Sequence, residues 1–522
     1  MAQMRDKLLL QLPPFLVSFA FLVGTACPVA LAEKGKVDFE VVTRLARQRA
    51  EAPFHSPKEH LPAALHADQL NYDNYREIRF KPDMALWKED GQKFQVQFFH
   101  PGYIYHEPVQ LNEFTSTHHQ RIRFAMDFFD YGKLDLKGKV PFDTGYAGFR
   151  VHYPLNRPDV MDELAVFQGA SYFRLLAQGL RYGISGRGLA LDCGEKGRVE
   201  EFPIFTDFWL GKPAPGETSL TIYALLDSVS VTGAYRFVLQ PGACTLADVE
   251  SVLFFRKVPG TIGVAPLTSM FWFGENTERK PDDYREEVHD SDGLCLVTES
   301  ERIWRPLSTG SDLRHSVFVV NKLKGFGLLQ RDRRHDHYED IFNFYHQTPS
   351  VFIEPVGEWG EGEVRLVELS TKDEYLDNVV AFWHPKVQPE PMQPWKMAYR
   401  MKWGSNAGSE SSPDGVRSTR VGVDIHDSGA LQFAIDFDGP ALQALTEASP
   451  PGCVPSCSPN AHIAEAQVVK HPFATGWRVM LKLVPASGNQ NPVDVRVSLS
   501  SGSKPLGETW TYLWSPPADK AP

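Results

Sequence analysis

The sequence lacks an excess of basic residues, and it lacks any long apolar run beyond its N-terminal segment. Its 54 Lys and Arg face 65 Asp and Glu, so the net charge is −11. That balance argues against binding nucleic acid or an anionic membrane through bulk charge and suits a neutral ligand. The G-x-S-x-G elbow, the Walker loop and H-E-x-x-H are also missing. The best-known motifs of serine hydrolases, P-loop enzymes and zinc proteases are therefore absent.

The one long apolar run belongs to an N-terminal export signal. Arg5 and Lys7 supply a positive start, an apolar run extends to Val23, and Ala30–Ala32 forms a small-x-small cleavage site. No twin-arginine pair precedes the run, which favours general secretion. We expect cleavage near Ala32 and an exported mature protein, because no later segment reaches the length of a membrane span.

Cysteines are few, and five remain after the signal peptide. An odd number in an exported chain leaves at least one free thiol. Cys453 and Cys457 lie in a Pro- and Ser-rich segment, PPGCVPSCSPN, where a local disulfide is compatible with an oxidising compartment. Cys193, Cys244 and Cys295 lie in apolar, strand-like surroundings that predict buried thiols.

Strand patterns dominate the rest of the chain. Aromatic residues make up 12%, and 40 Gly and 39 Pro accompany them, a composition that favours sheets and turns. Short, often alternating segments bounded by Gly, Pro or Asp recur from Tyr75 onward. Helical patterns are confined to residues 37–51 and 338–346. Many strands with few helices predict an all-β fold built as a large antiparallel sandwich or barrel.

A proline-rich segment suggests a division of the chain into domains. Four prolines between His384 and Pro394 cannot continue a sheet ladder and predict a linker. Beyond it, about seven short strands over roughly 120 residues suit an immunoglobulin-like sandwich. The predicted units are a signal peptide (1–32), a large β-sandwich (33–384), a linker (385–394) and an immunoglobulin-like domain (395–522).

The most distinctive stretch is Val367–Pro385, VELSTKDEYLDNVVAFWHP, which reads as strand, acidic loop, strand. Asp373, Glu374 and Asp377 fall within five positions. Carboxylates this close repel one another and are tolerated where they are solvated, bind a cation or perform acid–base work. By spacing alone, a solvated loop is the simpler interpretation.

Other polar segments keep two interpretations each. Asp290 lies in a turn, either as an ordinary turn residue or as a base. The charged segment Gln330–Tyr338 is compatible with a solvated face or with a polar wall that holds sugar hydroxyls. His335-x-His337 lacks a third ligand, so no metal is expected. The tryptophans are core residues by default, although any that line a cleft would offer apolar faces to sugar rings.

Several segments together identify a family resemblance. The chain resembles the periplasmic glucan biosynthesis proteins OpgG and OpgD (MdoG and MdoD), and its general-secretion signal is more similar to the G type. The resemblance covers nearly all of the mature chain and is weakest after Pro394. The segments that carry it are GASYFR (169–174), GRGLALD (186–192), LTIYALLDS (220–228), TGAYRF (232–237), GVAPLTSMFWFG (263–274), HDSDGL (289–294), IWRPL (303–307), GFGLLQRDR (325–333) and DNVVAFW (377–383).

The resemblance implies a fold, a compartment and an activity. It implies a mutarotase-like antiparallel β-sandwich followed by an immunoglobulin-like sandwich, in a periplasmic protein that makes osmoregulated glucans. Relatives look like inverting β-1,2-glucanases that need no cofactor or metal. By this resemblance Asp377 is the general acid and Asp290 the general base, and Tyr345 and Glu374 match positions of the proton path or of the site around it. Repulsion from Asp373 and Glu374 is expected to raise the pKa of Asp377.

The residues expected to contact glucan are Trp272, Trp304, Arg305, Arg331 and Arg333. Two other functions stay open, a β-1,2-glucan transglycosylase and a non-catalytic glucan-binding factor that works beside a membrane glucosyltransferase. The oligomeric state, a homodimer included, and endo or exo action are also left open.

Overall fold

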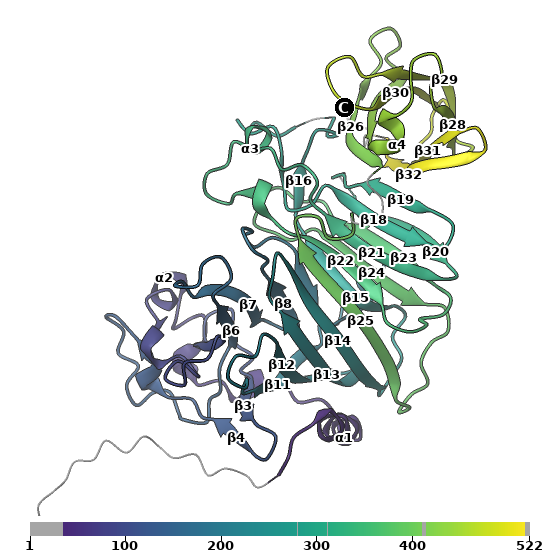
Figure 1. Cartoon of the computed structure of the whole chain (residues 1–522). Helices are drawn as coiled ribbons and strands as arrows, with labels where there is room; N and C mark the ends of the chain where they lie inside the picture. Colours follow the sequence, from purple (N-terminus) through teal and green to yellow (C-terminus); the bar gives the residue numbers. More distant parts are fainter. Residues whose placement is uncertain (1–34, 279, 311, 410–413, 517–522) are drawn as a thin grey trace, which may run out of the picture.

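The computed structural model describes residues 35–278, 280–310, 312–409 and 414–516. The predicted signal peptide and its cleavage site lie outside these residues. Strands dominate the fold, and the predicted all-β sandwich architecture is confirmed (Figure 1). Among the described residues, no helix combines the length and apolarity that crossing a bilayer requires.

Two large sheets form the main body. The ten-stranded sheet contains, in spatial order, β2 (Gln95–Phe99), β6 (Gly148–Tyr153), β7 (Asp162–Gln168), β8 (Tyr172–Leu175), β9 (Ser185–Arg187), β15 (Ile262–Ser269), β24 (Val379–Pro385), β23 (Gly362–Glu368) and β20 (Arg314–Val320), with β10 (Leu189–Leu191) also paired to β15. The fourteen-stranded sheet contains β28 (Gly452–Cys457), β31 (Val493–Ser501), β32 (Lys504–Trp514), β19 (Arg302–Pro306), β18 (Gly293–Thr298), β21 (Leu323–Leu329), β22 (Ser350–Pro355), β25 (Trp395–Gly404), β14 (Cys244–Phe255), β13 (Val231–Gln240), β12 (Leu220–Asp227), β11 (Ile204–Gly211), β3 (Gln110–Phe114) and β4 (His119–Ile122).

Smaller elements complete the fold. A four-stranded sheet contains β26 (Gly415–Val423), β27 (Leu431–Asp438), β30 (Trp477–Pro485) and β29 (Ala461–Lys470). Two pairs stand apart, β1 (Arg79–Phe80) with β5 (Phe129–Asp130) and β16 (Phe271–Phe273) with β17 (Val288–His289). The helices are α1 (Phe39–Ala50), α2 (Tyr72–Tyr75), α3 (His335–Tyr338) and α4 (Pro440–Gln443), with 3₁₀ turns at Pro57–His60, Ala63–Leu65, Pro82–Met84, Met126–Phe128 and Tyr345–Gln347.

Aromatic side chains join the two large sheets through one core. Phe149 on β6 packs edge-on against Phe208 on β11 at 5.0 Å between ring centroids. Phe167 on β7 meets Phe237 on β13 at 5.4 Å. All four rings are buried in the main hydrophobic cluster. Alternating apolar residues on both sheets thus bury a shared interior, as in a face-to-face sandwich.

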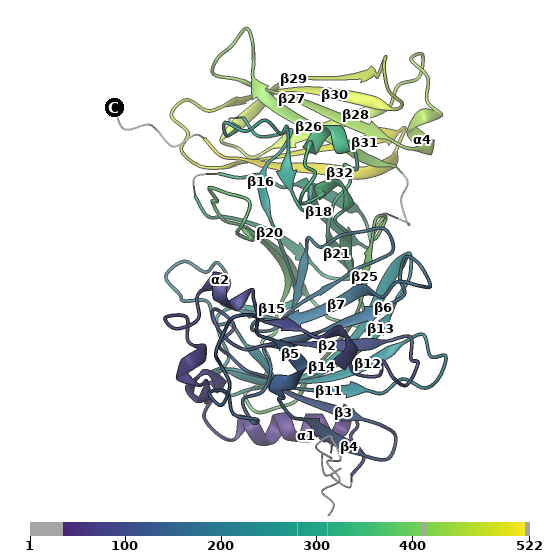
Figure 2. The same cartoon turned by 90° about the vertical axis from the view of Figure 1, so that its left-hand side faces the viewer.

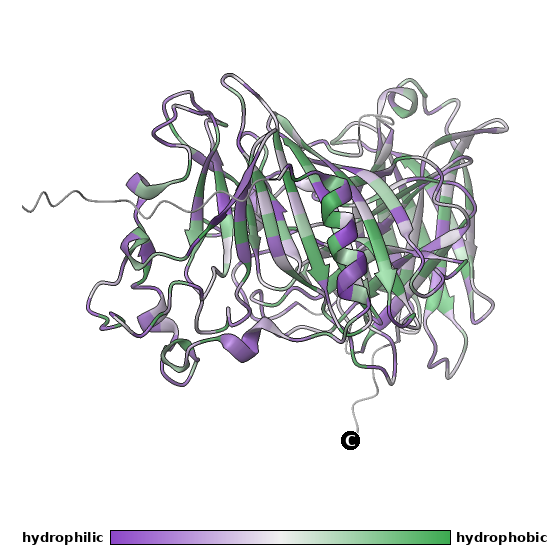
Figure 3. Ribbon diagram, turned by 90° about the horizontal axis from the view of Figure 1, so that it is seen from below, coloured by the Kyte–Doolittle hydropathy of each residue, from purple (hydrophilic) through white to green (hydrophobic). Residues whose placement is uncertain are grey.

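The predicted N-terminal helix is confirmed as α1, and it covers the outer face of the large sheet (Figure 3). The Asp38 carboxylate caps it by accepting a bond from the amide of Val41 at 3.1 Å. Its apolar stripe, Val42, Ala46 and Ala50, is buried against side chains of β11 to β14. The helix predicted at 338–346 is wrong, because Glu339 and Phe344 adopt left-handed φ angles of 50° and 58° that end α3 and precede the 3₁₀ turn.

The C-terminal strands form a second sandwich (Figure 2). The β26–β27–β30–β29 sheet packs on β28, β31 and β32, and the shared core includes Phe433, Val479, Val497 and Trp510. One face of this sandwich continues the large sheet, because β32 pairs in parallel with β19. The two sandwiches are therefore joined by backbone hydrogen bonds as well as by the chain.

One boundary predicted from the sequence requires correction. The segment expected to open the second domain is β25, which pairs with β14 and β22 in the middle of the large sheet. The Pro-rich segment 385–394 therefore joins β24 to β25 within the main body and does not link the two sandwiches. Alternating apolar residues bury one face of a strand in either domain, so the pattern could not assign this strand.

The disulfide considered for Cys453 and Cys457 is also wrong. Both residues are free thiols and lie on the single strand β28. Four residues of extended strand separate Cα atoms by about 13 Å, whereas a disulfide needs Cα atoms within roughly 7 Å. Because Pro and Ser are untypical of strands, the composition of this segment did not predict β28.

Candidate active site

Asp290 is positioned by the junction between β15 and β16. It follows β17 directly, and its amide donates to the carbonyl of Met270 at 2.8 Å. The hydroxyl of the next residue, Ser291, meets that of Ser269 at 2.7 Å, with both side chains buried. These contacts fix the backbone of Asp290 and of the residue that follows it.

Asp377 is positioned by the same junction. Its neighbour Asn378 donates its amide to the carbonyl of Ser269 at 3.0 Å. The Asn378 side chain accepts from the amide of Phe271 at 2.8 Å and donates to the carbonyl of that residue at 3.0 Å. Residues 269–271 thus bind the segments of both carboxylates and bring together two parts of the chain that are far apart in the sequence.

The two carboxyl groups interact electrostatically. Burial and the nearby charge of Asp377 raise the pKa of Asp290 to about 7. Burial also raises the pKa of Asp377, while Arg174, whose Nη2 lies 3.7 Å from Asp377 Oδ2, opposes that rise. The predicted direction for Asp377 is confirmed, but the predicted cause is wrong, because burial, and not repulsion from Asp373 and Glu374, raises this pKa.

Tyr345 and Glu374 form a hydrogen-bonded pair beside these acids. The buried Tyr345 hydroxyl donates to Glu374 Oε2 at 2.7 Å. Arg285 Nη1 donates to the same oxygen at 2.7 Å and to Asp340 Oδ2 at 2.8 Å. Burial and the bond to Glu374 raise the pKa of Tyr345, so its hydroxyl stays protonated. The four residues named by the resemblance therefore gather at one site.

A protonated histidine lies directly behind Asp290. His289 is fully buried, and its Nε2 meets Glu287 Oε2 at 2.8 Å while Nδ1 meets Gln330 Oε1 at 3.1 Å. The side-chain Nε2 of Gln330 donates to the carbonyls of His289 and Tyr345, which turns the side-chain Oε1 of Gln330 toward the His289 ring. Both ring nitrogens therefore donate, as only an imidazolium can.

The charge on His289 acts on Asp290. Burial would lower the pKa of His289, but the bond to Glu287 and the charges of Glu287 and Asp292 outweigh it and raise this pKa to about 9. The resulting positive charge opposes the rise in the pKa of Asp290. Asp290 is thus held between a carboxylate that favours its proton and an imidazolium that favours its ionised form.

A groove lies next to the segment that approaches Asp290. It encloses about 510 Å³, and its walls combine leucine side chains with polar residues that include Asp162, Glu163, Arg181 and Gln347. Gly183, next to the groove residue Tyr182, runs close to the base, because a Cβ atom at Gly183 would lie 3.0 Å from Asp290 Oδ1. The groove has the size to take a hydroxylated ligand on the side of Gly183 where Tyr182 lies.

The residues predicted to contact glucan fall into two groups. Trp272 is half-buried with Arg285 over its ring at 6.0 Å, close to Glu374. Arg333 donates to the carbonyls of His346 and Thr348 and thereby orients the segment after Tyr345. Both residues lie beside the acids.

The other three residues face the C-terminal sandwich. Trp304 is 3% exposed, and the Arg331 guanidinium lies 3.5 Å above its ring. Arg331 donates to both carboxylate oxygens of Glu508, and Arg305 binds Asp494. These side chains bind the two sandwiches together and lie away from the groove.

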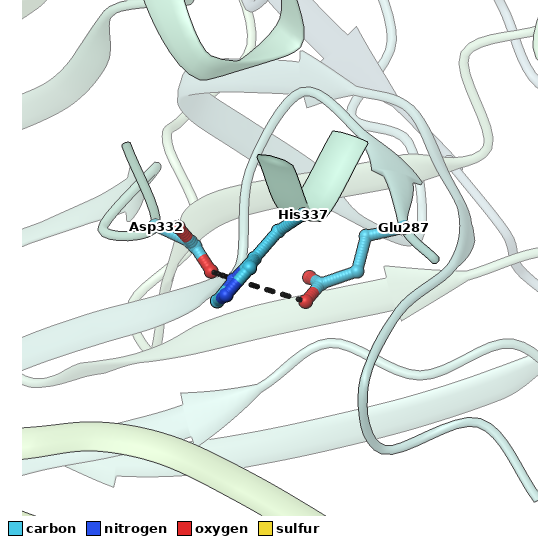
Figure 4. Close-up of side chains that lie close together, drawn as sticks. All are labelled: Glu287, Asp332 and His337. Atoms are coloured by element: carbon cyan, nitrogen blue, oxygen red, sulfur yellow. Dashed lines mark hydrogen bonds and ion pairs between the residues drawn. The ribbon is translucent and has the colours of Figure 1, made fainter. Parts of the chain in front are cut away.

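Two groups of side chains near Asp290 have the composition of metal ligands, and Figure 4 shows the one formed by Glu287, Asp332 and His337. Within the described chain, potential ligand atoms of Glu287, Asp332 and His337 lie within 4.8 Å of one another, as do those of Glu287, His289 and Asp292. His337 Nδ1 bonds to Asp332 and lies 3.8 Å from Glu287 Oε1. Contacts of the His337 and His289 rings with these carboxylates account for both groups. His335 packs against His346 and takes no part.

Sequence reasoning missed four residues of this site. Arg174 lies within GASYFR, and His289 lies within HDSDGL, so the motif signal was present but assigned no role to them. Gly183 and Arg285 have no local sequence signal. Two of the three carboxylates that bind Arg285, Asp340 and Glu374, come from segments far away in the sequence.

Comparisons with known proteins show which family the chain resembles. A family model described as "Periplasmic glucan biosynthesis protein, MdoG" matches residues 37–514. "Glucans biosynthesis protein G" of Ralstonia nicotianae is 42% identical over 484 residues, covering 91% of this chain and 95% of that protein. "Glucans biosynthesis protein D" of Stenotrophomonas maltophilia is 40% identical over 500 residues, covering 94% and 92%. The relatives extend over both sandwiches and the whole site.

Proposed function

Because the chain belongs to the family of periplasmic glucan biosynthesis proteins, we propose that it cleaves β-1,2-linked glucan by inverting hydrolysis. The observation that carries this proposal is the pairing of Asp290 with Asp377, close enough that one charge raises the pKa of the other. Inverting hydrolysis needs one protonated carboxyl group and one carboxylate on opposite sides of the scissile bond.

The proposal assigns different roles to the two acids. Burial favours the protonated form of Asp377, which donates its proton to the leaving-group oxygen as the bond from the anomeric carbon breaks. The imidazolium of His289 supports ionised Asp290, which accepts the proton of the attacking water. Tyr345 and Glu374 offer a hydrogen-bonded path along which that proton can move. The proposal requires no cofactor or metal.

The same proposal includes the compartment and the partners. A signal peptide at 1–32 delivers the protein to the periplasm, where a membrane glucosyltransferase supplies the linear glucan. Such a glucan is neutral, which suits a chain with a net charge of −11. The groove lined by Tyr182 and Gln347 is the expected binding region for the glucan.

Activity is expected to depend on pH as a bell-shaped curve. Only the singly protonated pair holds both a proton donor and a base, so the fully protonated and fully ionised forms are inactive. While Asp377 is ionised, Asp290 keeps a proton up to a pKa of about 7, so the coupled pair loses its last proton near this pH. The value of kcat/KM should therefore fall as the pH rises through about 7, and fall again in acid, where both groups are protonated. Initial rates on linear β-1,2-glucan across the pH range measure this profile, and activity still rising above pH 8 would contradict the coupled pair.

Replacing Gly183 with alanine should lower activity while leaving the protein folded. The new Cβ would lie 2.7 Å from Thr348 Cγ2 and 3.0 Å from Asp290 Oδ1, so either the base or the wall must shift. Displacing a catalytic group by about 1 Å can cost roughly 10²-fold in rate. Gly422→Ala is the control, since nothing lies within 4 Å of its added Cβ. Equal kcat/KM values for Gly183→Ala and Gly422→Ala would show that activity does not depend on where the Asp290 carboxyl group lies.

One incubation separates the proposed hydrolase from the two alternatives. Linear β-1,2-glucan is incubated with the pure protein, and the products are analysed by mass spectrometry. Hydrolysis adds one water per cleaved bond and shortens the chains. Transglycosylation conserves the total number of glycosidic bonds and yields cyclic chains or chains of redistributed length. A binding factor returns the substrate unchanged but shows saturable binding, and that result would overturn the enzymatic proposal.

A further inference from the structure

A single buried arginine clamps three loops next to the acids. Arg285 Nη1 binds Asp340 and Glu374, and its Nη2 binds Asp283 Oδ2 at 2.8 Å. The Arg285 side chain is only 8% exposed. Asp340 in turn accepts the amides of Phe342 and Asn343 at 2.8 and 2.6 Å. The loops at 283–285, 340–345 and 374–377 are thus fixed relative to one another.

These clamped loops expose large apolar side chains. Tyr375 is 86% exposed and Phe342 is 80% exposed, and Tyr284, Ile341 and Leu376 are also exposed. Isolated exposed apolar residues are ordinary on a protein surface. Here all five lie within two positions in the sequence of Arg285 or of a carboxylate residue that binds it. The loops that carry them are fixed by these ion pairs. Grouping of this kind indicates a binding surface.

The position of these side chains indicates what they bind. Tyr375 and Leu376 separate Glu374 from Asp377 in the chain, and Phe342 precedes Tyr345 by three residues. The general acid protonates the leaving-group oxygen, so residues beside Asp377 border that side of the scissile bond. The faces of a glucose ring carry C–H groups with partial positive charge, which suit the negative face of an aromatic ring.

We propose that Tyr375 and Phe342 form an aromatic rim on which glucose rings stack on the leaving-group side of the scissile bond. The proposal rests on the proposed function and adds a specificity-determining surface to it. The carboxylates that lie between these aromatic residues in the chain bind Arg285, so the exposed rings are the groups that this surface offers to a ligand.

The rim is tested by binding and by kinetics. Tyr375→Ala and Phe342→Ala are each placed in an Asp377→Asn background, and binding of linear β-1,2-glucan is measured by calorimetry. Each substitution should raise Kd about 3- to 10-fold, the size of one lost aromatic contact. In the wild-type background, each should raise KM more than it lowers kcat. Tyr375→Phe keeps the ring and should retain most of the affinity.

The control is Phe473→Ala, which removes an aromatic residue that is 94% exposed between β29 and β30. Unchanged Kd in both rim variants, with normal hydrolysis, would overturn the rim and leave the proposed function standing. Weakened binding by rim variants of a protein without turnover would support the rim and overturn hydrolysis. Loss of contact with a membrane glucosyltransferase, at unchanged glucan affinity, would assign the surface to a protein partner and overturn the rim.

Discussion

Replacing Asp377 with asparagine is expected to abolish the release of reducing ends from linear β-1,2-glucan. The amide cannot donate a proton to the leaving oxygen, and loss of general acid catalysis typically costs about 10²- to 10⁴-fold in kcat. The fold should remain intact, because the side chain keeps its shape and its ion pair with Arg174 is a long one, at 3.7 Å. Reducing-sugar assays measure the loss, and thermal unfolding verifies the fold.

The loop supplies its own control for this experiment. The Asp373 carboxylate accepts the amide of Tyr375 at 2.9 Å, and an asparagine oxygen can accept the same bond. Asp373→Asn should therefore retain activity although it also removes one charge from this loop. Asp290→Asn should lose activity as Asp377→Asn does, because water then lacks its base. Full activity in Asp377→Asn would remove that residue from the mechanism.

Replacing Glu508 with glutamine should destabilise the contact between the two sandwiches. The Glu508 side chain is 1% exposed and accepts bonds from Arg302, from both Nη atoms of Arg331 and from the amide of Val416. Removing this charge deprives two buried guanidinium groups of their carboxylate. Breaking a buried ion pair on one side costs about 3–5 kcal/mol, and denaturant unfolding measures the loss as a lower midpoint.

The matched control for Glu508 is Glu361→Gln, which removes an exposed carboxylate paired with Lys386 and should leave the midpoint unchanged. Acid should mimic the Glu508 substitution. Burial would raise the pKa of Glu508, but Arg331 and Arg302 outweigh it and lower this pKa below its usual value of 4.5. The stabilisation is therefore complete above pH 4.5 and is lost as the pH falls through the folded pKa. Equal midpoints for the two variants would show that this carboxylate does not hold the sandwiches together.

Much of the site was predictable because its signals are local. The family motifs carry Asp290 and Asp377, the resemblance also names Tyr345 and Glu374, and the structure gathers all four. Asp373 and Glu374 could not explain the raised pKa of Asp377, because burial is a property of the folded surroundings. The sequence could not predict a role for Arg285 or Gly183 either, because each acts on residues that are distant in the sequence.

The sequence by itself determined the all-β class, the N-terminal helix and the motif residues of the site, since strand alternation, capping and motifs are local properties. Tertiary structure decided which sheet each strand joins and what each charged side chain faces. The buried stripe of β25 would suit either sandwich, but pairing with β14 and β22 assigns it to the large sheet. Arg305 and Arg331 have the composition of a sugar-binding wall, yet their carboxylate partners on β31 and β32 make them contacts between the two sandwiches. An arginine binds whichever acceptor the fold brings within reach, and only long-range packing determines that acceptor.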